Sequence, residues 1–165
     1  MKGGNEMTYI ETLGSNAVKV KKILAVADTG KKNSALAEIS RALIENSDKI
    51  IEANQKDLTA AKENGMSVSM QDRLMLNEDR IKGIASAVDE LIKLEDPIGK
   101  VDNGSVRPNG MRITKIRVPM GVIGMIYESR PNVTADAATL CLKTGNAVIL
   151  RGGKEAYNSN KCICE

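Results

Sequence analysis

The chain has 165 residues, which is enough for one domain with a sizeable core. Its 24 basic and 21 acidic side chains are spread along the sequence and give a net charge of +3, and its only aromatic residues are three tyrosines. This composition argues against a nucleic-acid-binding surface. No apolar run reaches the roughly 20 residues of a membrane span, and we expect neither a signal peptide nor membrane association.

The numbers of histidine and cysteine residues limit which catalytic mechanisms and metal sites this chain can contain. The chain has no histidine, which excludes a Ser-His-Asp or Cys-His mechanism within it. Its three cysteines are odd in number and fit a reducing cytoplasm better than a disulfide framework. Cys162-Ile163-Cys164 has no second pair of ligands, so we expect no metal site. Cys141 lies in an apolar helical stretch and is expected in the core.

The first 95 or so residues have the periodicity of helices. Apolar residues three or four positions apart predict a first helix over residues 10–27, which Thr29-Gly30 stops. Asn33 is the expected cap of a second helix. Ser47-Asp48 can restart that helix, and Gly65 ends it.

A third long helix is predicted to begin at the cap residue Asn77 and to close before Pro97. Between Gly65 and Asn77, three methionines occupy the connecting segment, and core filling is the favoured interpretation for them: Met66, Met70 and Met75.

The pattern changes after Pro97. Asn103-Gly104 and Asn109-Gly110 are turn signals, and residues 111–118 alternate apolar and polar side chains. This segment therefore predicts a half-exposed strand that forms one arm of a hairpin.

The remaining residues are typical of a strand, a helix and a second strand. Residues 122–127 and 147–150 are short apolar runs, as in strands buried on both faces, and residues 135–142 supply the helical crossover. Polar residues follow each strand, at 128–132 and 151–154, where open parallel sheets bind ligands. The sequence thus predicts an α/β fold with a helical N-terminal layer, a β-hairpin arm and the first βαβ of a Rossmann-like nucleotide-binding domain.

Two segments carry a family resemblance. PMGVIGMIYESRPNVT and LKTGNAVILRGGKEA, within a similarity that covers about residues 22–161, resemble the gamma-glutamyl phosphate reductases (glutamate-5-semialdehyde dehydrogenases) of the aldehyde dehydrogenase superfamily. The resemblance implies a cytoplasmic, homo-oligomeric enzyme of proline biosynthesis. Its reaction would be the NADPH-dependent reduction of L-glutamate 5-phosphate to L-glutamate 5-semialdehyde and phosphate.

The resemblance also implies a division of the chain. Residues 1–97 would form the helical layer, 98–118 the oligomerisation arm, and 119–165 the start of the nucleotide-binding βαβ. Family members are much longer, and their nucleophilic cysteine lies beyond the last residue of this chain. The resemblance therefore implies an incomplete fold and an absent catalytic cysteine domain. It fades after Lys161, so the final residues are open to interpretation as an artefact.

Candidate site residues follow the two strands. Asn132 is the candidate oxyanion donor, although it can instead cap the following helix. Arg130 is the candidate substrate-binding residue, since a guanidinium pairs well with phosphate or carboxylate, and an ion pair with Glu128 is the alternative.

The candidate cofactor-binding residues are Arg151, Gly152, Gly153 and Lys154, whose cations suit the 2′-phosphate of NADP; the alternative is a solvated loop. Neither a P-loop nor a G-x-G-x-x-G fingerprint is present. Two other functions stay open. One is an ordinary aldehyde dehydrogenase, against which ESRPNVT argues because it replaces the PWN-type loop. The other is a non-catalytic fragment that binds nucleotide or self-associates.

Overall fold

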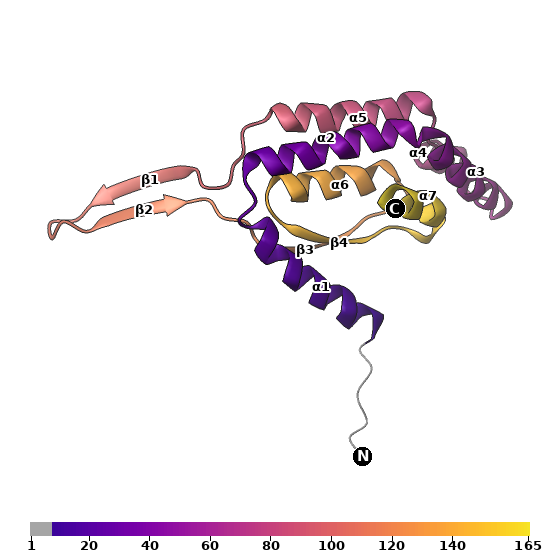
Figure 1. Cartoon of the computed structure of the whole chain (residues 1–165). Helices are drawn as coiled ribbons and strands as arrows, with labels where there is room; N and C mark the ends of the chain where they lie inside the picture. Colours follow the sequence, from indigo (N-terminus) through magenta and orange to yellow (C-terminus); the bar gives the residue numbers. More distant parts are fainter. Residues whose placement is uncertain (1–7) are drawn as a thin grey trace, which may run out of the picture.

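The structure is a computed structural model that describes residues 8–165. The first seven residues, where no signal peptide was expected, lie outside the described residues. The chain combines helices with two small sheets, as predicted, and no described helix is long and apolar enough to cross a membrane (Figure 1). The elements are α1 (Tyr9–Leu24), α2 (Thr29–Glu45), α3 (Ser47–Glu63), α4 (Val68–Leu74), α5 (Glu78–Lys93), β1 (Val101–Val106), β2 (Arg112–Ile116), β3 (Val122–Ile126), α6 (Asn132–Lys143), β4 (Ala147–Arg151), the 3₁₀ turn η1 (Lys154–Ala156) and α7 (Tyr157–Cys164).

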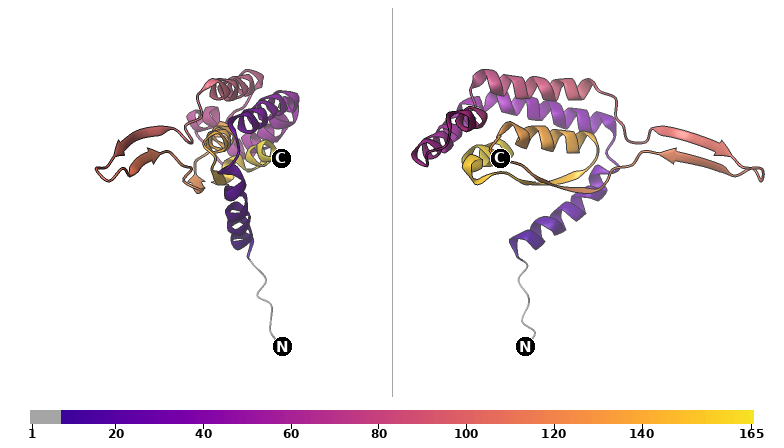
Figure 2. Two further views of the ribbon diagram at one scale, coloured as in Figure 1. Left: turned by 60° about the vertical axis from the view of Figure 1, so that its left-hand side comes forward. Right: turned by 180° about the vertical axis from the view of Figure 1, so that it is seen from behind.

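The core lies between α2, α5 and α6, which run side by side (Figures 1 and 2). Leu36 on α2 and Ile81 on α5 are completely buried there, and Ala135 joins them from α6. Asn77 caps α5 as predicted, because its side chain accepts a hydrogen bond of 2.8 Å from the backbone N–H of Arg80.

The predicted start of the second helix was wrong. Thr29-Gly30 begins α2 instead of stopping a helix, because the Asp28 side chain accepts a hydrogen bond of 2.8 Å from the Lys31 N–H and caps the helix there. Asn33 consequently lies within α2. Its side-chain oxygen accepts a hydrogen bond of 2.8 Å from Nζ of the buried Lys143. The predicted restart at Ser47 and the end near Gly65, where φ is 70°, are confirmed.

The methionine segment contains a short helix, α4, that the sequence analysis did not predict. Ser67 caps it by accepting a hydrogen bond from the Met70 N–H. Met66 and Met75 pack against buried Leu58 and Leu74, as core filling predicts. The prediction was wrong for Met70, which is exposed.

The predicted hairpin is confirmed, and it projects from the helical body as a two-stranded antiparallel arm (Figures 1 and 2). Asn109-Gly110 forms its turn, with a φ of 82° at Gly110. Asn103-Gly104 does not form a turn, because it pairs within β1 next to an irregularity in the strand register. The expectation of a half-exposed strand was wrong, because every residue of both strands is exposed and the arm has no buried face within residues 8–165.

Strands β3 and β4 form a parallel pair joined by α6, which confirms the βαβ prediction. The two strands lie between α6 on one side and α1 on the other (Figure 1). The expectation of strands buried on both faces was wrong for β3, which alternates between exposed and half-buried residues. It was also wrong for most of β4, where Ala147 is buried but residues 148–150 are half-buried. In the described structure β3 pairs only with β4, and Ile126 is 85% exposed.

Helix α7 is fixed to the body by Asp57, a buried residue of α3. The Asp57 carboxylate accepts hydrogen bonds from the backbone N–H groups of Asn158 (3.1 Å) and Ser159 (2.8 Å), which lie in the first turn of α7. It also accepts from both side chains, the Ser159 hydroxyl at 2.6 Å. A carboxylate from another helix thus caps α7 and satisfies its unpaired N–H groups.

Candidate active site

The loops that follow β3 and β4 meet at the carboxyl edge of the sheet. The Tyr127 N–H donates a hydrogen bond of 3.1 Å to the Arg151 carbonyl, which extends the strand pairing. Beyond it, the Ser129 hydroxyl donates to Glu155 at 3.2 Å. The candidate residues 128–132 and 151–154 therefore start from one edge of the sheet, where open parallel sheets bind ligands.

Gly152 is required by the packing of the chain itself. A Cβ at this position would lie 2.2 Å from Nδ2 of Asn160 and 3.2 Å from the Tyr127 ring. Asn160 is held there by a hydrogen bond of 2.9 Å from the Thr134 hydroxyl, which also lies 2.6 Å from the Tyr127 hydroxyl. The space beside Gly152 is therefore filled by a polar network that joins β3, α6 and α7.

We expect Gly152→Ala to destabilise the chain by about 1–3 kcal/mol, because the new methyl group overlaps with the Asn160 amide and forces it away from Thr134. Urea denaturation followed by circular dichroism measures the change. Gly83→Ala is the matched control, since a Cβ there meets nothing within 4 Å and alanine favours the helix. Equal stability of the Gly152→Ala and unsubstituted chains would contradict the packing argument.

The charged residues of the same loop fit an anionic ligand. Arg151 ends β4, Lys154 begins η1, and both side chains are exposed. Neither forms an ion pair within residues 8–165. Two unpaired cations next to the sheet edge suit a phosphate group of a dinucleotide. The glycines of the loop, unlike the two cations, are in contact with other residues of the chain. A Cβ at Gly153 would lie 2.8 Å from the Glu155 carboxylate, so packing within the chain is enough to require a glycine there.

Arg130 and Asn132 lie in a separate pocket of about 400 Å³ between α4, α5 and the start of α6. Asp136, one helical turn after Asn132, lines the same pocket and accepts a hydrogen bond of 3.1 Å from the Asn132 amide. The pocket also contains Arg80, which pairs with Asp72 at 2.8 Å. The loop 151–154 contributes no residue to this pocket, so the structure separates the two groups of candidates.

Two structural alternatives had been predicted for these residues, a helix cap by Asn132 and an ion pair between Arg130 and Glu128, and both were wrong. Asn132 is the first residue of α6, and no side chain caps that helix. Arg130 forms no ion pair with Glu128; its backbone N–H instead donates a hydrogen bond of 2.8 Å to the Glu128 carbonyl. Within the described residues, the Arg130 guanidinium has no side-chain partner and is exposed at the pocket.

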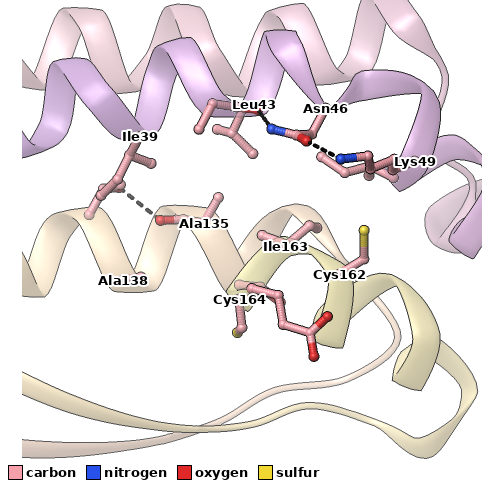
Figure 3. A pocket seen from close by; sticks show the side chains of 14 residues that line it. Ile39, Leu43, Asn46, Lys49, Ala135, Ala138, Cys162, Ile163 and Cys164 are labelled. Carbon is pink, nitrogen blue, oxygen red and sulfur yellow. Dashed lines mark hydrogen bonds between the residues drawn. The ribbon is translucent and has the colours of Figure 1, made fainter.

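A larger cavity of about 590 Å³ lies between α2, the start of α3, α6 and α7 (Figure 3). Its walls are mainly apolar, and Ile39, Leu43, Ala138 and Ile163 face it. None of the candidate site residues lines it. The candidate residues lie instead at the sheet edge and in the pocket of Arg130.

The cysteines do not form part of the candidate site. Cys141 is buried in α6 as predicted, and burial raises the pKa of its thiol, which disfavours the nucleophilic thiolate. Cys164 lies at the exposed end of α7, where partial loss of hydration raises the pKa of its thiol and the nearby Glu165 carboxylate adds to the effect. All three cysteines are free thiols, and no group of residues in the described part of the chain could hold a metal ion.

Asp136 was not among the site residues predicted from the sequence. The signal was present, because Asn132 and Asp136 are four positions apart and lie on one face of a helix that starts at the sheet edge. The network of Tyr127, Thr134 and Asn160 gave no comparable signal, since its members come from three elements.

The chain is similar to known proteins of one name. It is 57% identical over 152 residues to the gamma-glutamyl phosphate reductase of Clostridium perfringens (strain ATCC 13124), with 92% of this chain and 37% of the relative covered. For the enzyme of the same name from Caldanaerobacter subterraneus, the identity is 53% over 154 residues, with 93% and 37% covered. The chain thus spans about 37% of the length of these curated relatives. No family model matches it.

Solved structures agree with these relatives. The crystal structure of gamma-glutamyl phosphate reductase from Thermotoga maritima matches with a TM-score of 0.90 and 44% identity, covering 92% of this chain and 37% of that one. The Saccharomyces cerevisiae enzyme of the same name matches with a TM-score of 0.89 and 34% identity, covering 96% and 40%. The chain is homologous to the N-terminal portion of the gamma-glutamyl phosphate reductases.

The fold extends to more distant proteins. A putative aldehyde dehydrogenase from Bacillus subtilis matches with a TM-score of 0.68 at 21% identity, covering 93% of this chain and 32% of that one, which shows a shared fold. The predicted aldehyde dehydrogenase-like fold of this chain is therefore confirmed.

Proposed function

We propose that this chain is the N-terminal portion of an enzyme that reduces L-glutamate 5-phosphate to L-glutamate 5-semialdehyde and phosphate, with NADPH as reductant. The observation that carries the proposal is the identity of 57% to a gamma-glutamyl phosphate reductase over 92% of the chain. An ordinary aldehyde dehydrogenase is less well supported, since its match has 21% identity. We also propose the division into a helical layer (1–97), an arm that pairs with a second copy of the chain (98–118) and a nucleotide-binding βαβ (119–165).

The proposed reaction divides into acyl transfer and reduction. A cysteine thiolate attacks the acyl phosphate, a thioester forms and phosphate leaves. The nicotinamide cofactor, which Arg151 and Lys154 would help to hold, would supply the hydride for reduction of the thioester to the aldehyde, with the thiolate as leaving group. The buried Cys141 does not suit the role of nucleophile, which we assign to a part of the protein outside this chain.

The residues of this chain would bind and orient. Asn132 would donate its amide N–H to the oxyanion that develops during acyl transfer, a contact typically worth about 10²–10³ in rate. Arg130 would hold the phosphate or the carboxylate of the substrate. Arg151 and Lys154 would bind the 2′-phosphate of NADP, since both are exposed cations at the sheet edge.

The test is the reverse reaction in the full-length protein. We expect L-glutamate 5-semialdehyde to be oxidised with formation of NADPH only when inorganic phosphate is present, because phosphate must release the acyl group from the enzyme. NADPH absorbance follows the reaction. Equal rates without phosphate, with L-glutamate as product, would instead indicate an ordinary aldehyde dehydrogenase and would contradict the proposal.

A further inference from the structure

Asp136 carries a half-buried carboxylate that has no cationic partner within the described residues. It lies on α6 and lines the pocket of about 400 Å³ that also contains Arg130 and Asn132. In the part of the chain that the structure describes, the only hydrogen bond of this carboxylate is the one of 3.1 Å from the neutral amide of Asn132. No lysine or arginine within residues 8–165 forms an ion pair with it.

An unpaired carboxylate in such a position is unfavourable because burial removes part of its hydration. Burial raises the pKa of Asp136, although the hydrogen bond from Asn132 partly offsets this effect. A cation within the pocket would relieve the loss of hydration. Asp72 lines the same pocket but differs from Asp136, because its carboxylate already forms an ion pair of 2.8 Å with Arg80.

The pocket contains unpaired charges of both signs. Arg130 and Arg73 line it, and neither guanidinium has an anionic partner in the described part of the chain. Arg130 and Asp136 do not form an ion pair with each other, so each stays available to a ligand. A ligand that carries both an ammonium and an anionic group would satisfy both residues, as a free amino acid does.

The shape of the pocket suits a small molecule. Its volume of about 400 Å³ falls within the usual range for ligand sites. Gly83 and Ala87 on α5 form part of its wall, and no atom lies within 4 Å of the place that a Cβ on Gly83 would take. The wall opposite α6 therefore has space for a ligand.

We propose that Asp136 binds the α-ammonium group of the substrate and makes the enzyme select an α-amino acid over its analogue without the amino group. This assignment rests on the proposed function and adds a specificity-determining residue to it. Asn132 would hold the reacting carbonyl near the start of α6. The Asp136 carboxylate lies 3.1 Å from the Asn132 amide and would meet the ammonium group of the same short substrate. Arg130 takes the anionic group.

The experiment compares two aldehydes in the full-length protein with phosphate and NADP: L-glutamate 5-semialdehyde, and 5-oxopentanoate, which lacks the amino group. The unsubstituted protein is expected to prefer the amino substrate. Asp136→Asn should lower kcat/KM for the amino substrate about 100-fold, because it removes one partner of a desolvated charge pair. The same change should have little effect on kcat/KM for 5-oxopentanoate. Asp136→Glu keeps the charge and should retain part of the preference.

Asp89→Asn, the same change at an exposed position of α5 outside the pocket, is the matched control and should alter neither substrate. If Asp136→Asn does not fold, Asp136→Ser allows the same comparison with a smaller neutral side chain. Equal losses for both aldehydes would overturn the assignment, because Asp136 would then act only on the position of Asn132. Turnover of neither aldehyde by the unsubstituted protein would refute the proposed function itself, and the assignment with it.

Discussion

Replacing Asp57 with alanine is expected to lower the free energy of unfolding by about 3 kcal/mol. The change leaves the N–H group of the buried Ser159, and that of the more exposed Asn158, without their acceptor, and hydrogen bonds to a charged group are worth about 1.5–3 kcal/mol. It also removes a negative charge from the N-terminus of α7. Urea denaturation monitored by circular dichroism gives the value.

The control for this prediction is Glu52→Ala on the same helix. Glu52 is exposed and forms a surface ion pair of 3.0 Å with Lys56, so its loss should cost less than about 0.5 kcal/mol. Equal losses of stability for Asp57→Ala and Glu52→Ala would show that the carboxylate of α3 does not hold α7 in place.

Removing the cations of the loop after β4 should reduce the affinity of the full-length protein for NADPH. If Arg151 or Lys154 contacts the 2′-phosphate, its replacement by alanine should weaken NADPH by about 1.5–3 kcal/mol, which is roughly tenfold to 150-fold in the dissociation constant. NADH lacks this phosphate and should be affected much less. Fluorescence titration with both cofactors measures the two effects.

The matched control is Lys115→Ala, which removes an exposed cation on the arm and should alter neither cofactor. Equal weakening of NADPH and NADH by Arg151→Ala and Lys154→Ala would mean that these side chains affect the loop itself, and recognition of the 2′-phosphate would have to be assigned elsewhere.

The sequence predicted those features whose determinants are local. The Asn77 cap, the Asn109-Gly110 turn and the two strands joined by α6 each follow from residues that are close together in the chain. The predicted start of α2 was wrong because two residues that can cap a helix, Asp28 and Asn33, lie within a few positions of each other. Only the folded structure shows that the Asn33 side chain bonds to Lys143 instead.

Other features that the sequence did not predict depend on distant residues. Asp57 and Ser159 are 102 positions apart, and no pattern along the chain relates them. Asp136 is different, because its spacing from Asn132 was visible but its lack of a cationic partner was not. Only the folded chain shows which charges remain unpaired.

The projecting arm has a consequence for how the chain responds to proteolysis. It is the covalent connection between the helices α1–α5 and the βαβ unit, and all residues of its strands are exposed. A protease cut after Arg112 would therefore produce two fragments. These would remain associated, because α6 stays packed on α2 and α5 and the N-terminus of α7 stays bonded to Asp57. Backbone amides of the arm would likewise exchange with solvent through local opening, while those of α5 stay protected until the core unfolds.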